Sequence, residues 1–170
     1  MVQGTFQSPF YASFEAFYAE DRVRLINFLV AFGAPHADAE DIVQEAMLSA
    51  ALNWETASIN PRPYVRTAVK RIYLRRKGQD QNRAWAEQQH LDAGNTTALF
   101  DEDTRHIYDI VRALPEAQRE VIAWTIDGYK PAEIAEFTER AVDTMYALRR
   151  TARQAIRDKL VEQEPEEGRS

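Results

Sequence analysis

The chain of 170 residues contains no cysteine, which excludes disulfide bonds and thiolate metal sites. Its three histidines, His36, His90 and His106, are too scattered to form a zinc-like cluster. No apolar run approaches the ~20 residues that span a bilayer, and the N-terminus lacks the basic-then-apolar order of a signal peptide. We therefore expect a cytoplasmic protein with no membrane insertion, no metal site and no cofactor.

The patterns that mark an enzyme are also missing. The sequence contains no nucleophile–base pair, no glycine-rich phosphate loop and no cluster of metal ligands. A hydrolase or metalloenzyme is therefore a poor interpretation, and we predict no catalytic residues. Strand-like alternation and internal repeats are absent as well, so the apolar residues must be interpreted by helical spacing.

The charge is distributed unevenly. The formal net charge of −6 argues against nucleic-acid binding, which usually leaves a basic footprint. However, residues 1–77 carry nine basic and eight acidic side chains, and residues 104–160 carry ten and nine. The excess acid lies in residues 78–103 and 161–170. Two nearly neutral blocks are thus separated by an acidic segment.

The first block has the pattern of three helices. Apolar residues recur at helical spacing from Ser13 to Phe32, and Gly33 is placed to end that helix. Asp38 is predicted to cap a second helix, whose apolar stripe runs from Ile42 to Trp54. The prolines of the Asn60-Pro-Arg-Pro63 segment favour the start of a third helix.

The remaining chain completes an all-α prediction. Helices are expected near 104–114, 115–126, 131–138 and 141–161, and residues 84–91 could form a short helix within a linker. We predict two small helical domains, at residues 10–78 and 104–161. An acidic linker (79–103) joins them, and a disordered acidic tail (162–170) follows.

The last two predicted helices have the order of a helix-turn-helix. At ~100° per residue, the long helix places its apolar residues, Met145, Leu148, Ala152, Ala155 and Ile156, on one side. The opposite arc carries Tyr146, Arg149, Arg150, Arg153 and Arg157, and no acid. A solvated face usually mixes both signs, so DNA contact is favoured over incidental charge.

The third helix is strongly basic. Residues 62–77 contain seven basic side chains and no acid: Arg62, Arg66, Lys70, Arg71, Arg75, Arg76 and Lys77. Helical projection places Arg62, Arg66, Lys70 and Lys77 on one face opposite the apolar stripe, with the rings of Tyr64 and Tyr73 nearby. Basic residues among aromatics suit melted DNA. For the tyrosines alone, a core position is favoured.

The second helix carries an acidic cluster within Asp38-Ala-Glu-Asp-Ile-Val-Gln-Glu45. No histidine or nucleophile accompanies it, so acid–base chemistry is a poor interpretation. Asp41 and Glu45 are expected one turn apart on an exposed face, flanked by Gln44. We interpret this face as a protein-docking surface, with a plain capped helix as the alternative.

These segments occur in the order of one family. Asp38–Glu45 closely resembles the core-polymerase-binding helix of extracytoplasmic-function sigma factors, and Asn60-Pro-Arg-Pro-Tyr-Val-Arg66 resembles the lead into their promoter-melting helix. Leu114-Pro-Glu-Ala-Gln-Arg-Glu-Val121 is similar to the opening of their fourth domain. Asp127-Gly-Tyr-Lys-Pro-Ala-Glu-Ile-Ala-Glu136 is similar to the first helix of its helix-turn-helix. The resemblance covers nearly all of residues 13–160.

The resemblance implies a transcription initiation factor that binds core RNA polymerase and directs it to promoters, with an anti-sigma factor as a candidate third partner. It implies polymerase docking by Asp38, Asp41, Gln44 and Glu45. The implied contacts to the minus-ten element are Asn60, Arg62, Tyr64, Arg66, Lys70, Arg71 and Arg75. The implied contacts to the minus-thirty-five element are Lys130, Arg140, Thr144, Tyr146, Arg149, Arg150 and Arg153.

The sequence departs from the family at several positions. Arg71 and Arg75 stand where the family often has Asn and Asp, and the turn reads Thr138-Glu-Arg140 where Leu-Gly-Ile is usual. A non-glycine residue at positive φ there costs roughly 1 kcal/mol, or the turn differs. This departure leaves an alternative: a sigma-derived regulatory protein that docks on polymerase or a regulator without reading promoter DNA.

Overall fold

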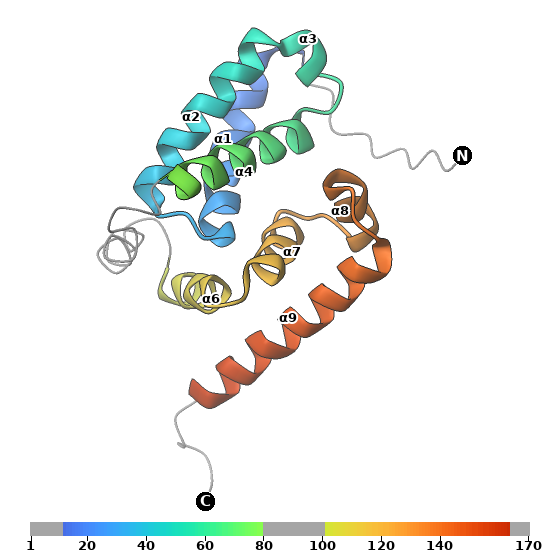
Figure 1. Cartoon of the computed structure of the whole chain (residues 1–170). Helices are drawn as coiled ribbons and strands as arrows, with labels where there is room; N and C mark the ends of the chain where they lie inside the picture. The colour runs from blue at the N-terminus through green and yellow to red at the C-terminus, as the bar shows by residue number, and fades with distance from the viewer. Residues whose placement is uncertain (1–11, 80–100, 164–170) are drawn as a thin grey trace, which may run out of the picture. The chain divides into compact units, whose positions relative to one another are not determined.

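The protein is described by a computed structural model that covers residues 12–79 and 101–163. Within these ranges it forms eight α-helices and no strand (Figure 1). The helices divide into two compact units, the first built from α1 to α4 and the second from α6 to α9. The prediction of an all-α chain with two helical domains is thereby confirmed. None of the described helices is long and apolar enough to cross a membrane.

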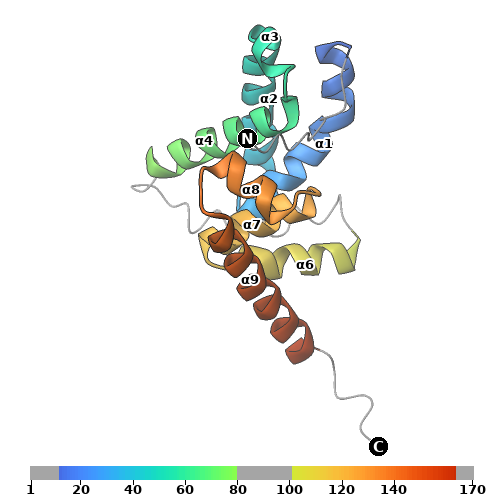
Figure 2. The ribbon, with the colours of Figure 1, turned by 90° about the vertical axis from the view of Figure 1, so that its right-hand side faces the viewer.

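The first unit contains α1 (Phe14–Phe32), α2 (His36–Leu52), α3 (Trp54–Ala57) and α4 (Pro61–Gln79). As predicted, the prolines begin α4, because Pro61 needs no hydrogen-bond partner in a first turn. Helix α2 packs against α4 (Figures 1 and 2). Both helices bury apolar residues at helical spacing: Ile42, Val43, Ala46 and Met47 in α2, and Val65, Val69, Ile72 and Tyr73 in α4.

The second helix differs from its prediction at both ends. It begins at His36 with Pro35 as its N-cap, and Asp38 lies in its first turn instead of capping it. Pro35 takes over because its carbonyl accepts the first helical bond, from the N–H of Ala39 at 2.9 Å. The helix also ends at Leu52, so Trp54 belongs to the separate helix α3.

Trp54 forms an aromatic cluster with α1. Its ring centroid lies 5.6 Å from that of Phe14 and 5.7 Å from that of Phe17. The break before Trp54 is stabilised by Asn53, whose side-chain amide donates to the carbonyl oxygen of Ser49 at 2.8 Å. The short helix α3 thus turns the tryptophan toward α1 and closes one end of the unit.

The second unit contains α6 (Glu102–Arg112), α7 (Glu116–Ile126), α8 (Pro131–Thr138) and α9 (Val142–Gln163). The predicted bounds agree exactly for α8 and within about two residues elsewhere. Helix α9 packs against α7 and α8. It continues to Gln163, so the predicted disordered tail begins too early. Residues 164–170 and the predicted short helix at 84–91 lie outside the described residues.

A trio of aromatic residues forms the centre of the second unit. The ring centroids of Trp124, Tyr129 and Phe137 lie 5.3–5.5 Å apart. Such tilted and edge-to-face contacts stabilise beyond area burial alone. Because Trp124 comes from α7 and Phe137 from α8, the trio fixes the orientation of the two helices that precede α9.

Three helices end in the same way, in a Schellman motif. After α1 and α7 the left-handed position is a glycine: Gly33 has φ 129° and Gly128 has φ 100°. After α8 the same position is Glu139, with φ 54°. There the N–H of Arg140 donates to the carbonyl oxygen of Ala135 at 3.0 Å. Glu139 therefore adopts the strained conformation, at a cost of roughly 1 kcal/mol.

Candidate nucleic-acid and protein interface

The outward arc of α9 is exposed and basic, as the helical projection predicted. Tyr146 is 44% exposed, Arg149 is half-buried, and Arg150, Arg153 and Arg157 are exposed. On the opposite side Met145 and Ala152 are fully buried against the unit. The four arginines of the arc make no ion pair with another residue of the described ranges. This arc therefore offers unneutralised positive charge.

Two residues of the arc contact each other. The guanidinium carbon of Arg149 lies 5.7 Å from the centre of the Tyr146 ring, a cation–π distance. This contact holds the Arg149 side chain over the Tyr146 ring, and Tyr146 itself lies one helical turn before Arg150. Thr144, in the first turn of α9, is exposed. The N-terminal half of α9 thus presents a hydroxyl, a phenol and two guanidinium groups.

Two predicted DNA contacts before α9 have structural roles. The guanidinium of Arg140 lies 3.3 Å from the carboxylate of Glu120, which is almost completely buried in α7. At the start of α8, the backbone N–H of Lys130 donates to the buried carboxylate of Glu133. Arg140 therefore neutralises an interior acid and fixes the turn, while the Lys130 residue remains exposed.

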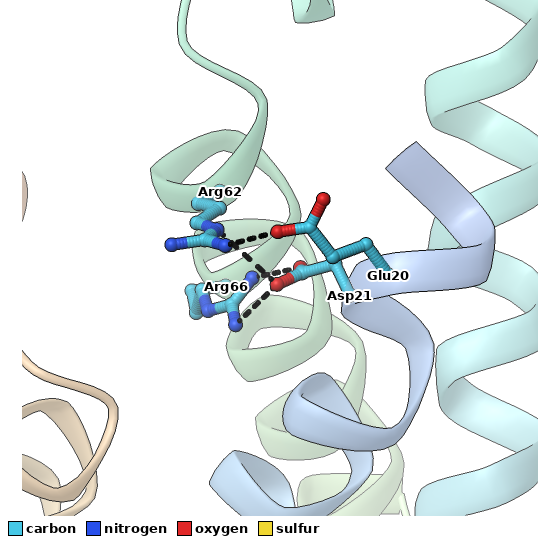
Figure 3. A network of polar contacts seen from close by, with 4 residues as sticks. All are labelled: Glu20, Asp21, Arg62 and Arg66. Atoms are coloured by element: carbon cyan, nitrogen blue, oxygen red, sulfur yellow. Dashed lines mark hydrogen bonds and ion pairs between the residues drawn. The ribbon is translucent and has the colours of Figure 1, made fainter. Parts of the chain in front are cut away.

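The basic helix α4 differs from its prediction, because acids from other helices neutralise it. Arg66 is fully buried and forms a two-pronged ion pair with the buried Asp21 of α1 (Figure 3). One of the two hydrogen bonds, from Nη2 to Oδ1, is 3.0 Å long. The expectation that Arg66 lies on a solvent-facing basic surface is therefore wrong.

The same network extends to the surface. Arg62 Nη2 lies 3.1 Å from Glu20 Oε1, and Arg62 Nε lies 3.4 Å from Asp21 Oδ1 (Figure 3). The Arg62 side chain is 16% exposed and that of Glu20 is 56% exposed. Arg62 and Arg66 of α4 thus form ion pairs with α1, and in this conformation their charges are neutralised by these acids. Helical projection could not show this, because both acids lie on another helix.

A second group of ion pairs joins the end of α4 to α2. Arg76 donates to Asp41 at 2.8 Å and to Glu45 at 2.6 Å, and Arg75 donates to Glu45 at 3.0 Å. The hydrogen bond to Asp41 raises the pKa of Arg76 above its ordinary value. As predicted, Asp41 and Glu45 are exposed one turn apart, with side chains 67% and 43% exposed. Their charges, however, are already paired.

The other predicted residues of the first unit differ in exposure. Gln44 and Arg71 are exposed, and Arg71 makes no ion pair with any other described residue. Asp38, Asn60, Tyr64 and Lys70 are half-buried. Tyr73 is 1% exposed, as favoured for a core tyrosine. Arg71 is thus the most available cation among those predicted on α4.

The sequence interpretation missed four charged residues: Glu20, Asp21, Arg76 as an ion-pair partner of α2, and Glu120. A signal existed for Asp21, because it shares the helical stripe of the fully buried Phe17 and Leu25. A carboxylate on an apolar stripe requires a buried cationic partner. Within the described residues, no group of three acidic or histidine side chains could hold a metal ion.

Comparisons with known proteins address the first unit and the whole fold separately. Residues 17–83 match the family model of sigma-70 region 2. Among curated proteins, none matches the chain in sequence. A solved structure has a similar fold, with a TM-score of 0.67 and 17% sequence identity, and it covers 89% of this chain and 98% of that chain. It is described as a co-crystal structure of the sigma factor RpoE in complex with the anti-sigma factor NepR from Bartonella quintana.

The sequence match and the fold agree. The match to region 2 spans α2, α3 and α4 and most of α1. The fold similarity covers 89% of the chain and therefore extends over both units. The first unit therefore contains a sigma-70 region 2, and the two helical units together have a fold similar to that of the solved sigma factor.

Proposed function

We propose that the chain initiates transcription by dividing three contacts among three helices. Helix α2 docks on core RNA polymerase, α4 holds the melted minus-ten strand, and α9 reads the minus-thirty-five duplex. The observation that carries this proposal is the outward arc of α9, whose four arginines have no ion-pair partner among the described residues. It follows the short α8 in a helix-turn-helix, which suits insertion into a major groove.

Within α9, position along the helix assigns the roles. The N-terminal part of a recognition helix meets base edges, and later residues meet the backbone. Tyr146, Arg149 and Arg150 therefore specify sequence, and Arg153 binds phosphate. Arg157 lies two turns beyond Arg150 and contacts DNA little. Thr144, in the first turn of α9, and the Lys130 side chain, just before α8, supply further DNA contacts. Arg140 instead stabilises the turn through its ion pair with the buried Glu120.

Within α4, exposure assigns the roles. Arg71 is exposed and has no ion-pair partner among the described residues, so it contacts the strand directly. Tyr64 and Asn60, half-buried at the start of α4, border the same surface. Lys70 adds charge beside Arg71. Arg62 and Arg66 act as positioning residues, because their ion pairs with α1 fix the orientation of the helix that carries Arg71.

The remaining assignments follow from the same scheme. The chain acts in the cytoplasm as a non-catalytic factor, with an anti-sigma factor as a candidate regulator. The two domains follow the predicted division with bounds moved to the helix ends: the first ends with α4 at Gln79, and the second runs from the start of α6 at Glu102 to the end of α9 at Gln163. Asp38, Asp41, Gln44 and Glu45 form the docking surface of α2, and the exposure of Asp41, Gln44 and Glu45 supports it.

The test is promoter-specific runoff transcription with purified chain and core polymerase. Parent chain should start transcription from one class of promoter, and Arg150→Ala should relax that preference at one position of the upstream element. Arg157→Ala is the matched control on the same helix and should retain it. If the chain binds core polymerase but starts transcription from no promoter class, it is instead the regulatory docking protein described as the alternative.

A further inference from the structure

The ion pairs between α2 and α4 connect two surfaces that have separate functions in the proposal above. Asp41 and Glu45 belong to the polymerase-docking surface, and Arg75 and Arg76 end the helix that holds DNA. The four side chains form one cluster of two cations and two anions, linked by contacts of 2.6–3.0 Å. While they pair with one another, neither surface offers its full charge to a partner.

The cluster is accessible enough to exchange partners. The side chains of Arg75 and Arg76 are 56% and 30% exposed, so solvent and ions reach them. Exposed ion pairs of this kind contribute little to stability and are readily replaced. The Asp21–Arg66 pair contrasts with them, because both of its members are fully buried. Of these two groups of ion pairs, it is the cluster at the C-terminal end of α4 that can open without disturbing the core.

We propose that Arg75 and Arg76 are phosphate-binding residues. Their ion pairs with Asp41 and Glu45 keep them from DNA until the two carboxylates bind another cation. A cation from polymerase that pairs with the two carboxylates releases both guanidinium groups to the phosphodiester backbone of single-stranded DNA. This inference rests on the proposed function, and it gives Arg76 a role that the motif did not suggest. By linkage, strand binding then strengthens polymerase binding by the same factor as polymerase strengthens strand binding.

The first experiment removes the ion pairs of Arg75 and Arg76 by substitution and measures DNA binding in the absence of polymerase. Binding of the full chain to a short labelled single-stranded oligonucleotide is measured by fluorescence anisotropy at several salt concentrations. In Asp41→Asn/Glu45→Gln, both arginines should be released, which adds two phosphate contacts. The plot of log affinity against log salt should become steeper by about 1.4, since each phosphate on a single strand contributes about 0.7. At about 0.1 M salt this amounts to up to about 25-fold tighter binding.

Two controls separate release of the arginines from a general change of charge. Glu15→Gln/Glu55→Gln removes the same two charges from exposed positions of the same unit and should change affinity much less. In an Arg75→Gln/Arg76→Gln background, the Asp41→Asn/Glu45→Gln change should give no gain. An equal gain in the Glu15→Gln/Glu55→Gln control, or a gain that persists without the arginines, overturns the proposal.

The second experiment measures reciprocity with core polymerase. The oligonucleotide should raise the affinity of the parent chain for core polymerase, and it should not do so for Arg75→Gln/Arg76→Gln. An oligonucleotide effect that is equal in both chains overturns the coupling. Failure of the parent chain to bind core polymerase would overturn the proposed function and the trigger with it. The anisotropy experiment still decides whether the carboxylates restrain the arginines.

Discussion

The buried ion pair of Asp21 and Arg66 gives the sharpest prediction about stability. Both side chains are fully buried, and Asp21 Oδ1 also lies 3.4 Å from Arg62 Nε (Figure 3). Asp21→Ala removes the carboxylate and leaves the Arg66 guanidinium charged in the interior. Such a loss costs about 3–5 kcal/mol, a large share of the 5–15 kcal/mol that is typical of a domain.

The partner substitution should cost less. Arg66→Met leaves the Asp21 carboxylate beside Arg62, so part of its charge remains compensated, and we expect a loss of about 1–3 kcal/mol. Replacing both residues, in Asp21→Ala/Arg66→Met, removes the buried charges together and should cost only about 1–2 kcal/mol. The two substitutions should therefore be coupled by at least about 2 kcal/mol.

The measurement must follow the first unit alone, because a chain with two units need not unfold in one step. Hydrogen exchange by mass spectrometry in increasing urea gives a free energy for peptides of α1 and α4, with peptides of α9 as the internal reference. Glu20→Ala is the matched control: its side chain is 56% exposed, so its loss should cost under about 1 kcal/mol.

Two results would refute the reasoning. If the costs of Asp21→Ala and Arg66→Met add within about 0.5 kcal/mol in the double variant, the two charges do not interact. If Asp21→Ala costs no more than Glu20→Ala, Asp21 is not enclosed with a cation. An equal loss of unfolding free energy in the α9 peptides would show instead that the substitution acts on the whole chain.

Three further predictions concern the second unit. Glu139→Gly should raise the stability of this unit by about 0.5–1 kcal/mol, because glycine adopts the left-handed conformation without strain; a lower melting temperature would contradict this. Arg150→Ala should relax preference at one position of the upstream element by about 1–3 kcal/mol, whereas Arg153→Ala should weaken all sequences evenly and lower the salt slope by about one; an even loss for Arg150→Ala across a library of element variants would show that it does not read bases. The hydrogen bond from the Thr104 N–H lowers the pKa of Asp101, so its stabilisation of α6 is present at neutral pH. This stabilisation should be lost as the pH falls through the pKa of Asp101 in the unfolded chain, ~4, and then through its lower pKa in the folded chain. A Thr104 amide resonance that titrates with the ordinary pKa of an aspartate would rule this out.

Much of the fold was predictable because the signals were local. The apolar stripes of α4 and α9 repeat at helical spacing, and Gly33 and the proline at 131 mark helix ends by their own backbone preferences. The left-handed conformation of Glu139 was one of the two alternatives that the sequence of the turn left open. The error at α2 was of the same local kind, since Pro35 and Asp38 both suit a helix start and only the backbone geometry decides between them.

The candidate interface was less predictable, because its charges pair across helices. The projection of α4 correctly placed its apolar residues, but it could not include acids from elsewhere in the chain. Arg66 and Asp21 are separated by 45 positions, and Arg76 and Asp41 by 35. Only the tertiary fold brings them together. The arc of α9 was predicted better because it has no ion-pair partner on any described neighbour.

The two aromatic clusters give each unit its own optical signal. Trp54 is half-buried against Phe14 and Phe17, whereas Trp124 is almost fully buried against Tyr129 and Phe137. A tryptophan in contact with water emits at longer wavelength than one in an apolar core, so the two emission bands should differ. With Trp85 replaced by phenylalanine, emission spectra recorded during unfolding would follow the two units at two wavelengths. They would show which unit loses its structure first.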